Sequence, residues 1–310
     1  MPISSKYLRI SVTNICNLHC YFCHNEGQSK DMLQYELTKD DIVFIVDMAK
    51  KLGFTKIKLT GGEPTLRKDI IEIIREISNI GVSDFSIITN GVKLYELVDE
   101  FILSGLPRIN VTLQTLNKKK FKREIHYDIS KLDSIVKGID KAISLGYNDV
   151  KINFIYHSPK SENDFLEICN FAAERNLIVV LLPILLINPR KEDKIISLDN
   201  LYIKLQSFGI ISEHSFCDKE GIEKRLIKLC NGATILLRKN ELADILPFNS
   251  CLGCLLKTKC REGIFPIRIT SDGFLLPCLA EGISRIDLKD SIIKKDEELF
   301  SKIMNHFRIM

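Results

Sequence analysis

The feature that most constrains the fold of this chain is a regular alternation of short apolar runs with longer helical patterns. Six runs have the length and composition of buried strands, at residues 7–12, 56–60, 85–89, 108–112, 150–156 and 178–186. Apolar residues recur at helical spacing between them, at 38–53, 69–80, 92–104, 132–145 and 161–175. Such alternation is typical of βα units around a parallel sheet. Right-handed crossovers would curl six units into an open barrel or a twisted sheet, and periodicity alone does not choose between them.

The ends of these helices carry local signals. Thr38 is a candidate N-cap, with Asp41 in the first turn, and Gly53 and Gly81 follow the last periodic residues of the first two helices. The alternation weakens after Asn188-Pro189-Arg190-Lys191, a polar and helix-breaking stretch. We therefore expect a core at residues 1–188 and an appended region at 189–310, with ligands at the carboxyl ends of the core strands.

The chain has ten cysteines among its 310 residues. Residues 1–6 have no apolar stretch of the kind that marks a secretory signal. The longest apolar run, 178–187, contains Pro183 and is too short to span a bilayer, so we expect a cytoplasmic protein. In a reducing compartment grouped cysteines indicate metal or cluster ligands rather than disulfides. Seven are grouped: Cys16, Cys20, Cys23, Cys251, Cys254, Cys260 and Cys278. Cys169, Cys217 and Cys230 stand apart, and we expect structural roles for them.

The first cysteine group has the spacing C-x3-C-x2-C and directly follows the first predicted strand. Thiolates favour iron–sulfur clusters or zinc. Three cysteines on a four-iron cluster would leave one iron open to a ligand. The alternative is a zinc site completed by His19 or His24, which would be closed and inert.

Polar motifs follow the next two strands as well. Gly61-Gly62-Glu63-Pro64 ends the second strand, where paired glycines allow close approach to the backbone and a carboxylate could hold an ammonium group. Thr89-Asn90-Gly91 ends the third strand. Polar motifs on three consecutive strand ends, one with the cysteine triad, predict the rim of an active site.

With these motifs the sequence resembles radical S-adenosylmethionine (SAM) enzymes, and specifically the GTP 3′,8-cyclase (MoaA) family of molybdenum-cofactor biosynthesis. The similar segments are 8–16, 60–69, 109–113, 268–273 and 277–279. The resemblance implies an α/β fold, a partial (β/α)6 parallel barrel with a small C-terminal auxiliary-cluster region. It also implies a small-molecule substrate and an electron donor such as flavodoxin or ferredoxin.

The resemblance further implies which residues serve each cofactor. Cys16, Cys20 and Cys23 would hold a 4Fe–4S cluster whose open iron is chelated by SAM. Residues around the bound SAM would be Gly61, Gly62, Glu63, Pro64, Thr89 and Thr112. One electron would cleave SAM to methionine and a 5′-deoxyadenosyl radical, which abstracts a substrate hydrogen.

Five basic residues are implied as contacts to a nucleotide and its phosphates: Arg9, Lys56, Lys58, Lys151 and Arg268. Lys56 and Lys58 alternate with apolar residues, so both would point to one face of their strand. Lysines inside a barrel would need an anionic partner or water. The alternative is that this face is solvated or covered by helices.

The sequence departs from the cyclase pattern at several positions. The second cysteine group, Cys251-x2-Cys254-x5-Cys260-x17-Cys278, has one cysteine more than the family and predicts a second 4Fe–4S cluster, with structural zinc as the alternative. Pro266 stands where the family has an arginine, and Gln114 where it has an aspartate. The sixth strand lacks the expected arginine and glutamate, and the chain ends without a double glycine. These departures count against GTP as the substrate. They do not affect the residues expected to carry out the radical chemistry.

Two other functions compete with a nucleotide-modifying enzyme. The spacing Cys-x2-Cys-x5-Cys also resembles auxiliary-cluster domains of radical SAM enzymes that modify peptides. A structural zinc or iron–sulfur protein is the third possibility, against which Gly-Gly-Glu-Pro argues. A net charge of +4, from 44 basic and 40 acidic residues, gives no signature of nucleic-acid binding, and the basic cluster at 118–123 is typical of a solvated helix start.

Overall fold

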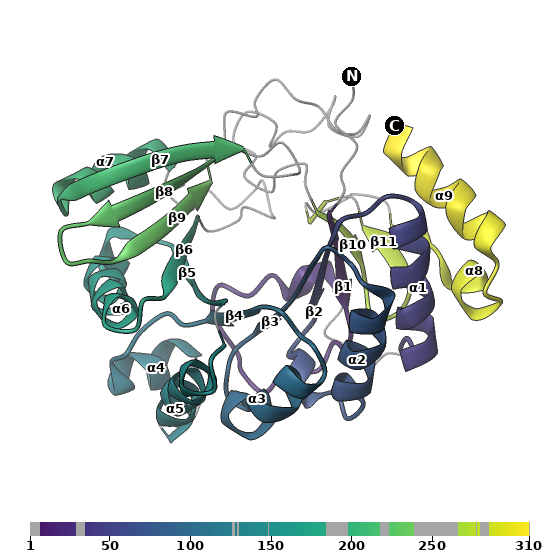
Figure 1. Ribbon diagram of the computed structural model, residues 1–310, viewed down its shortest axis with the longest axis horizontal. Coiled ribbons are helices and arrows are strands. Elements are labelled where there is room, and N and C mark those ends of the chain that lie inside the picture. The colour runs from purple at the N-terminus through teal and green to yellow at the C-terminus, as the bar shows by residue number, and fades with distance from the viewer. Residues whose placement is uncertain are drawn as a thin grey trace.

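One curled sheet organises the part of the chain that the computed structural model describes. The described residues are 7–28, 35–125, 128, 130–147, 149–183, 198–217, 223–238, 266–276, 278–279 and 285–309. Twelve strands follow one another in the order β12-β11-β10-β1-β2-β3-β4-β5-β6-β9-β8-β7. The sheet is not closed on itself, and Figure 1 shows it curled into an open half-barrel.

The centre of the sheet consists of six parallel strands in chain order. They are β1 (Tyr7–Ser11), β2 (Lys56–Thr60), β3 (Asp84–Thr89), β4 (Ile109–Thr112), β5 (Val150–Tyr156) and β6 (Ile178–Pro183). Each pairs in parallel with the next. The prediction of a partial βα barrel is therefore confirmed, with strand boundaries that differ from those expected by a few residues.

Helices between these strands cover the outer face of the curled sheet (Figure 1). They are α1 (Lys39–Lys51), α2 (Ile70–Ile80), α3 (Leu94–Leu103), α4 (Lys118–Ile125), α5 (Ser130–Ser144) and α6 (Glu162–Ala173). Thr38 caps α1 in a reciprocal capping box with Asp41, and Gly81 ends α2 in the left-handed conformation at φ 72°. No helix within the described residues is long and apolar enough to cross a membrane.

The helix α4 contains the basic cluster of residues 118–123. The Asn117 side chain accepts hydrogen bonds from the backbone N–H groups of Lys119 and Lys120 and so caps this helix. Lys120 pairs with Asp164 at 2.7 Å, and Lys118 pairs with Asp133 at 2.7 Å. These lysines therefore serve helix packing and the surface rather than a common anion site.

Residues after 188 extend the same sheet at both edges. On one side β9 (Thr234–Arg238) pairs in parallel with β6, and β8 (Glu223–Leu229) and β7 (Ile210–Cys217) continue as an antiparallel meander. On the other side β10 (Pro266–Ile269) pairs in parallel with β1 and is followed by β11 (Phe274–Leu276) and β12 (Ile286–Asp287). Helices α7 (Leu198–Ser207), α8 (Lys289–Ile293) and α9 (Glu297–Ile309) complete the described chain.

The two faces of the sheet differ in chemistry because side chains alternate along each strand. In β2, Ile57 and Leu59 are fully buried in the apolar layer beneath the helices. Lys56 and Lys58 point to the opposite, concave face, where both line a cavity. The apolar residues of the strands thus pack against the helices, and the polar residues that alternate with them face the interior of the half-barrel.

Candidate active site

The cysteine loop, residues 12–25, leaves the carboxyl end of β1. Cys16 and Cys20 are half-buried and Cys23 is exposed, and all three are free thiols. Backbone N–H groups of Leu18 and Asn25 lie 3.4 and 3.3 Å from the sulfurs of Cys16 and Cys23. Hydrogen bonds to sulfur are a common feature of iron–sulfur sites. Among the described residues, no three His, Cys, Asp or Glu side chains are gathered in an arrangement that would hold a metal ion.

The thiols affect one another electrostatically. Burial, together with the neighbouring Cys23 and Cys16, raises the pKa of the Cys20 thiol to about 12. Burial also raises the pKa of Cys16. Metal ligation requires thiolates, so loading a cluster here must release protons. Three soft donors in one eight-residue loop fit a 4Fe–4S cluster with one iron left for another ligand.

Gly61 and Gly62 pack against the backbone of the cysteine loop. The N–H of Gly62 donates to the carbonyl of Thr13, and that of Glu63 donates to the carbonyl of Ile15, both at 2.8 Å. A Cβ atom on Gly61 would lie 2.3 Å from the Thr13 oxygen, and one on Gly62 would lie 2.2 Å from the Ile15 oxygen. The close neighbour that requires glycine is therefore the chain itself, and the Gly-Gly pair fixes the position of the cysteine loop.

Glu63 joins the ends of β2 and β3. Its carboxylate is 1% exposed and accepts bonds from Thr65 N (3.0 Å), Thr65 Oγ1 (2.6 Å), Thr89 Oγ1 (2.6 Å) and Asn90 N (2.6 Å). Burial raises its pKa although these hydrogen bonds act in the opposite direction. Three of the four bonds end on Oε1, so Oε2 keeps capacity for a ligand ammonium group. Pro64, also buried, begins the short 3-10 turn Pro64–Leu66 that follows.

Thr89 and Asn90 connect this carboxylate to the cysteine loop. Thr89 is buried and directs its hydroxyl to Glu63, while the Asn90 side chain donates to Asn17 at 2.8 Å. Asn17 lies between Cys16 and Cys20. Thr112 is half-buried at the end of β4, the next strand. The motifs expected at three neighbouring strand ends are thus brought together by side-chain hydrogen bonds.

Aromatic side chains extend this rim to β5. Tyr21, 45% exposed, meets the ring of Phe22 at 5.2 Å and that of His157 at 4.9 Å between centroids, both nearly perpendicular. His157 directly follows β5. Ile15 in the same loop is 62% exposed. Exposed apolar groups beside the thiols provide a surface on which a flat organic ligand could pack.

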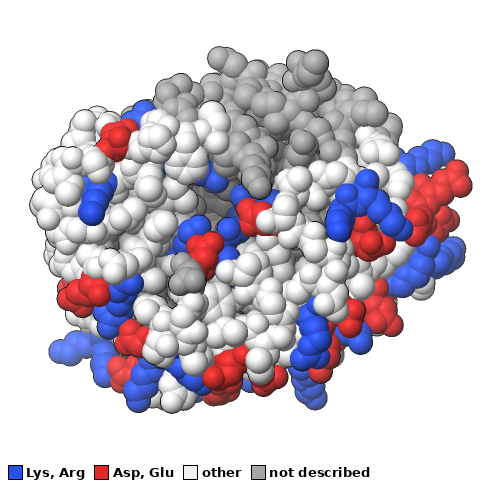
Figure 2. Space-filling view, viewed as in Figure 1, with Lys and Arg blue, Asp and Glu red and all other residues white. Residues whose placement is uncertain are grey.

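A cavity of about 610 Å³ lies inside the half-barrel, toward the amino ends of the strands. Four of the five basic residues expected to bind substrate line it: Arg9, Lys56, Lys58 and Lys151. Arg108 and Lys224 also line it, so six cationic side chains face two acidic ones, Asp84 and Asp149. In Figure 2, blue and red side chains meet around the hollow at the centre of the view. The volume suits a ligand of nucleotide size.

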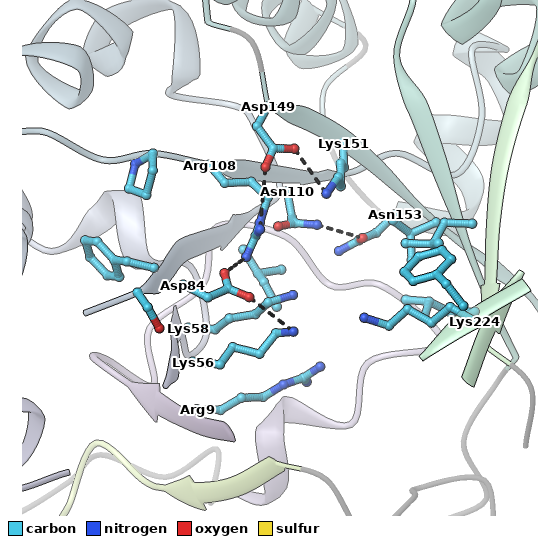
Figure 3. A pocket seen from close by; sticks show the side chains of 18 of the residues that line it. Arg9, Lys56, Lys58, Asp84, Arg108, Asn110, Asp149, Lys151, Asn153 and Lys224 are labelled. Carbon is cyan, nitrogen blue, oxygen red and sulfur yellow. Dashed lines mark hydrogen bonds and ion pairs between the residues drawn. The ribbon is translucent and has the colours of Figure 1, made fainter. Parts of the chain in front are cut away.

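Ion pairs hold these side chains in place on one wall of the cavity (Figure 3). Asp84 contacts both Lys56 (3.2 Å) and Arg108, and Asp149 contacts Lys151 (3.1 Å) and Arg108 (3.5 Å). Burial would raise the pKa of Asp84, but the charges of Arg108 and Lys56 lower it. Lys224 of β8 lies across the cavity from this wall (Figure 3).

Beneath the cavity, the cations surround a buried tyrosine. Arg9, Lys56 and Lys58 all lie over the Tyr7 ring, at 5.5, 5.2 and 5.7 Å from its centroid. Tyr7 is fully buried, and its hydroxyl accepts a bond from Arg9 Nε at 2.8 Å. Attraction to the ring helps keep three like charges close together.

Arg268 does not line the cavity. It is 3% exposed, and its guanidinium donates to Glu26 at 3.1 Å. Glu26 also accepts from Arg9 at 3.2 Å. Burial alone would raise the pKa of Glu26, but the charges of Arg9, His24 and Arg268 lower it to about 2. Glu26 is therefore an ionised link between β1, β10 and the segment that follows Cys23.

Several of these residues were not found by sequence reasoning. Glu26, Arg108 and Lys224 carry no motif. For Lys224 alone, the alternation within β8 offered a possible signal. Gln114, at the position of the expected aspartate, accepts a bond from the Ile155 N–H at 3.2 Å, and its buried Nε2 has no partner among the described residues. In the second cysteine group Cys278 is half-buried, whereas Cys251, Cys254 and Cys260 lie outside the described residues.

The comparison with protein-family models agrees with this geometry. Residues 10–172, which contain the cysteine loop and the strands β2 to β5, match the model of the radical SAM superfamily. The chain belongs to the radical SAM superfamily. Membership implies a 4Fe–4S cluster and SAM as cofactors, which the three thiols and the Gly-Gly-Glu rim fit.

Similar curated proteins define the family more closely. A probable GTP 3′,8-cyclase of Pyrococcus abyssi is 34% identical over 285 residues, which cover 91% of this chain and 87% of that protein. A probable GTP 3′,8-cyclase of Saccharolobus islandicus is 32% identical over 284 residues, covering 91% and 85%. Within the superfamily, the chain belongs to the GTP 3′,8-cyclase family, as its motifs suggested.

Solved structures with the same fold include enzymes of other kinds. Streptococcus suis SuiB bound to the precursor peptide SuiA superposes with a TM-score of 0.64 and 20% identity, over 97% of this chain and 66% of SuiB. The chain thus spans about two thirds of the SuiB structure. Native anSMEcpe with bound AdoMet gives a TM-score of 0.57 and 15% identity, over 97% of this chain and 83% of that one. At these identities the likeness shows the fold alone.

Proposed function

We propose that this radical SAM enzyme acts on a purine nucleoside triphosphate, with cyclisation of GTP as its reaction. The observation that carries the proposal is the cavity in which Arg9, Lys56, Lys58 and Lys151 converge with Arg108 and Lys224. Six cationic side chains converge on a cavity lined by two carboxylates, and guanidinium and ammonium groups in such number are the donors that recognise a polyphosphate. The curated relatives are named as probable GTP 3′,8-cyclases, which supports GTP over other anions.

The two ends of the half-barrel would divide the work. Cys16, Cys20 and Cys23 would hold the cluster, which together with SAM would supply the one-electron chemistry that abstracts a hydrogen atom from the substrate. Oε2 of Glu63 would hold the ammonium group of SAM, and Thr112 would contact its nucleoside part. The cations at the amino ends of the strands would hold the phosphates and so fix which substrate carbon faces the radical.

The proposal includes a second cluster, an electron donor and an indirect role for Arg268. Cys251, Cys254, Cys260 and Cys278 would hold a second 4Fe–4S cluster in the region 189–310, where four thiolates close the metal site. The electron would come from a small carrier such as a flavodoxin or a ferredoxin. Arg268 would act on the substrate through Glu26 and Arg9 rather than by direct contact.

The test is the release of 5′-deoxyadenosine from anaerobically reconstituted protein given SAM and a reductant, with and without GTP. We expect GTP to stimulate release strongly and to be consumed, ATP to act more weakly, and a Cys16→Ala variant to be inactive. A Lys56→Met, Lys58→Met double variant should keep the cluster and lose most of the stimulation by GTP.

Each alternative outcome has a definite meaning. Release that does not depend on any nucleotide would overturn the proposed substrate and direct the search to peptides, while the radical SAM assignment would stand. Equal stimulation of the wild type and of the double lysine variant would show that the cavity is not the substrate site. If protein shown to carry its iron cleaves no SAM, whichever nucleotide is added, its proposed role as a radical SAM enzyme is contradicted.

A further inference from the structure

Two asparagines on neighbouring strands form a buried polar pair in the wall of the cavity. Asn110 of β4 is 3% exposed and Asn153 of β5 is 7% exposed, and both line the cavity. Asn110 Nδ2 donates to Asn153 Oδ1 at 3.4 Å, and Figure 3 shows the two carboxamides directed toward each other. This is a long hydrogen bond, close to the limit at which such contacts count.

The pair leaves hydrogen-bonding capacity unused. Asn110 Oδ1 is buried and has no partner within the described residues, and no hydrogen bond of Asn153 Nδ2 is found there either. One acceptor and one donor group therefore stand side by side. Rotating both carboxamides by 180° exchanges their roles and leaves the same combination. Because a buried polar group without a partner destabilises the folded chain, such a pair in the wall of a cavity indicates a ligand.

The position of the pair says which part of a ligand it would meet. Asn110 is in register with Lys151 across β4 and β5, and Asn153 follows Lys151 by two residues on the same face. Two residues of a strand span about 6.6 Å. Asn110 is therefore level with Lys151, and Asn153 lies one step closer to the carboxyl ends of the strands, where the cysteine loop begins. A phosphate on Lys151 would place the adjoining sugar ring at this height.

We infer that Asn110 and Asn153 form a subsite that reads a ribose hydroxyl of the substrate. This deepens the proposed function and rests on it, because it assumes a phosphorylated nucleoside in the cavity. A hydroxyl donates one hydrogen bond and accepts others through the same oxygen, which matches one free acceptor beside one free donor. The pair is uncharged, so it adds no attraction for phosphate. It selects sugars that carry the hydroxyl over deoxy analogues.

The inference predicts coupling between the protein and the sugar. The dissociation constants of GTP, 2′-deoxy-GTP and 3′-deoxy-GTP would be measured by calorimetry on the reconstituted, SAM-bound enzyme. For wild type, loss of the hydroxyl that is read should weaken binding about tenfold or more, since the two carboxamides are then left unpaired. An Asn153→Ala variant should bind GTP more weakly than wild type by a similar factor. For this variant, replacing GTP by the matching deoxy nucleotide should weaken binding little further.

The controls separate this role from a structural one. Asn231→Ala removes a carboxamide from the exposed Asn170–Asn231 pair outside the cavity, joined at 2.7 Å, and should leave all three constants unchanged. Each variant is compared with itself across nucleotides, so partial unfolding cancels. Asn153→Ser offers a milder change in case the alanine variant does not fold, with the same expected coupling.

The outcomes distinguish this inference from the proposed function. If wild type binds none of the nucleotides, the proposed function fails and the inference fails with it. If GTP binds, and if the factors by which Asn153→Ala and the deoxy sugar each weaken binding simply multiply when combined, the two act independently. The subsite is then overturned and the proposed function stands. If Asn153→Ala instead abolishes discrimination between GTP and inosine triphosphate, the pair reads the base, and the assignment to the sugar is wrong.

Discussion

At the scale of single residues, the two glycines after β2 serve the cysteine loop. Glycine is needed at these positions because the loop backbone lies closer than a Cβ atom allows. Glu63 follows the two glycines, and the hydrogen bonds that it accepts from Thr89 and Asn90 extend the contact to the end of β3. A short sequence motif thus fixes the relative positions of three strand ends.

We expect Gly62→Ala to displace the cysteine loop. The new Cβ would lie 2.2 Å from the Ile15 oxygen, and such overpacking typically costs about 1–3 kcal/mol. Iron content and charge-transfer absorbance after reconstitution should fall well below those of wild type. Gly146→Ala is the control, because it has a positive φ of 80° but nothing within 4 Å of the new Cβ. A Gly62→Ala variant that loads iron as wild type does would contradict this reading.

The buried Glu26 should make stability depend on acid. Its pKa falls from 4.5 to about 2 on folding, so its ionised form stabilises the folded state at neutral pH by about 3 kcal/mol. Because the folded pKa is the lower one, this contribution is present above about pH 5 and is lost as the pH falls toward 2.

Urea unfolding of the cluster-free chain at several pH values tests this expectation. Glu26→Gln should lower the free energy of unfolding at neutral pH and flatten its decline between about pH 5 and pH 2. Glu297→Gln removes an exposed partner of Lys51 and should change little. An unchanged pH slope in Glu26→Gln would show that Arg9 and Arg268 do not hold this carboxylate ionised.

At the scale of elements, the meander β7–β9 brings a cation to the far side of the cavity. Lys224 begins β8 and faces the wall formed by Arg9, Lys56 and Lys58 (Figure 3). A substrate phosphate between the two sides would contact cations from strands that are far apart in the sequence. The meander thus closes a cavity whose other cationic side chains belong to the βα core.

Lys224→Met should therefore weaken GTP binding by about tenfold, the effect of losing one charge-assisted hydrogen bond. The loss should shrink as ionic strength rises, because salt screens the remaining charges. Lys228→Met is the matched control, since Lys228 is on the same strand but is exposed and not part of the cavity. Equal dissociation constants for wild type and Lys224→Met at low salt would remove Lys224 from the site.

At the scale of the whole molecule, the C-terminal region holds both edges of the core sheet. Strand β10 pairs with β1, and β9 pairs with β6. Arg268 in β10 and Ser271 in the turn that follows also bind Glu26 and Gln28, respectively, of the N-terminal segment. Without these strands, β1 and β6 would be open edges with unpaired backbone groups.

A fragment of residues 1–188 should consequently fail to fold as an independent unit. We expect it to aggregate or to unfold without a cooperative transition, because open parallel edges and an incompletely paired Glu26 remain. Size-exclusion chromatography and urea denaturation, with the full chain as reference, would show the difference. A monomeric fragment with a sharp transition would prove that the core at 1–188 is autonomous.

Local sequence patterns predicted the βα core and the strand ends that carry the cysteine triad and the Gly-Gly-Glu motif. The six strands, their helices and the caps at Thr38 and Gly81 follow from local periodicity and from residues that fix backbone conformation, which act over a few positions. The cysteine triad and the Gly-Gly-Glu motif are equally local. Their meeting follows from topology, because the carboxyl ends of parallel strands share one edge.

Only the tertiary structure decided which residues surround the cavity and how the sheet ends. The Glu26–Arg268 pair joins positions 242 residues apart, and β9 lies beside β6 although β7 and β8 come between them in the chain. The pairing of Asn110 with Asn153 depends on the register of β4 and β5. Such contacts depend on long-range strand order and register, which a pattern of neighbouring residues does not encode. This is why Arg108, Lys224 and the asparagine pair emerged only from the folded chain.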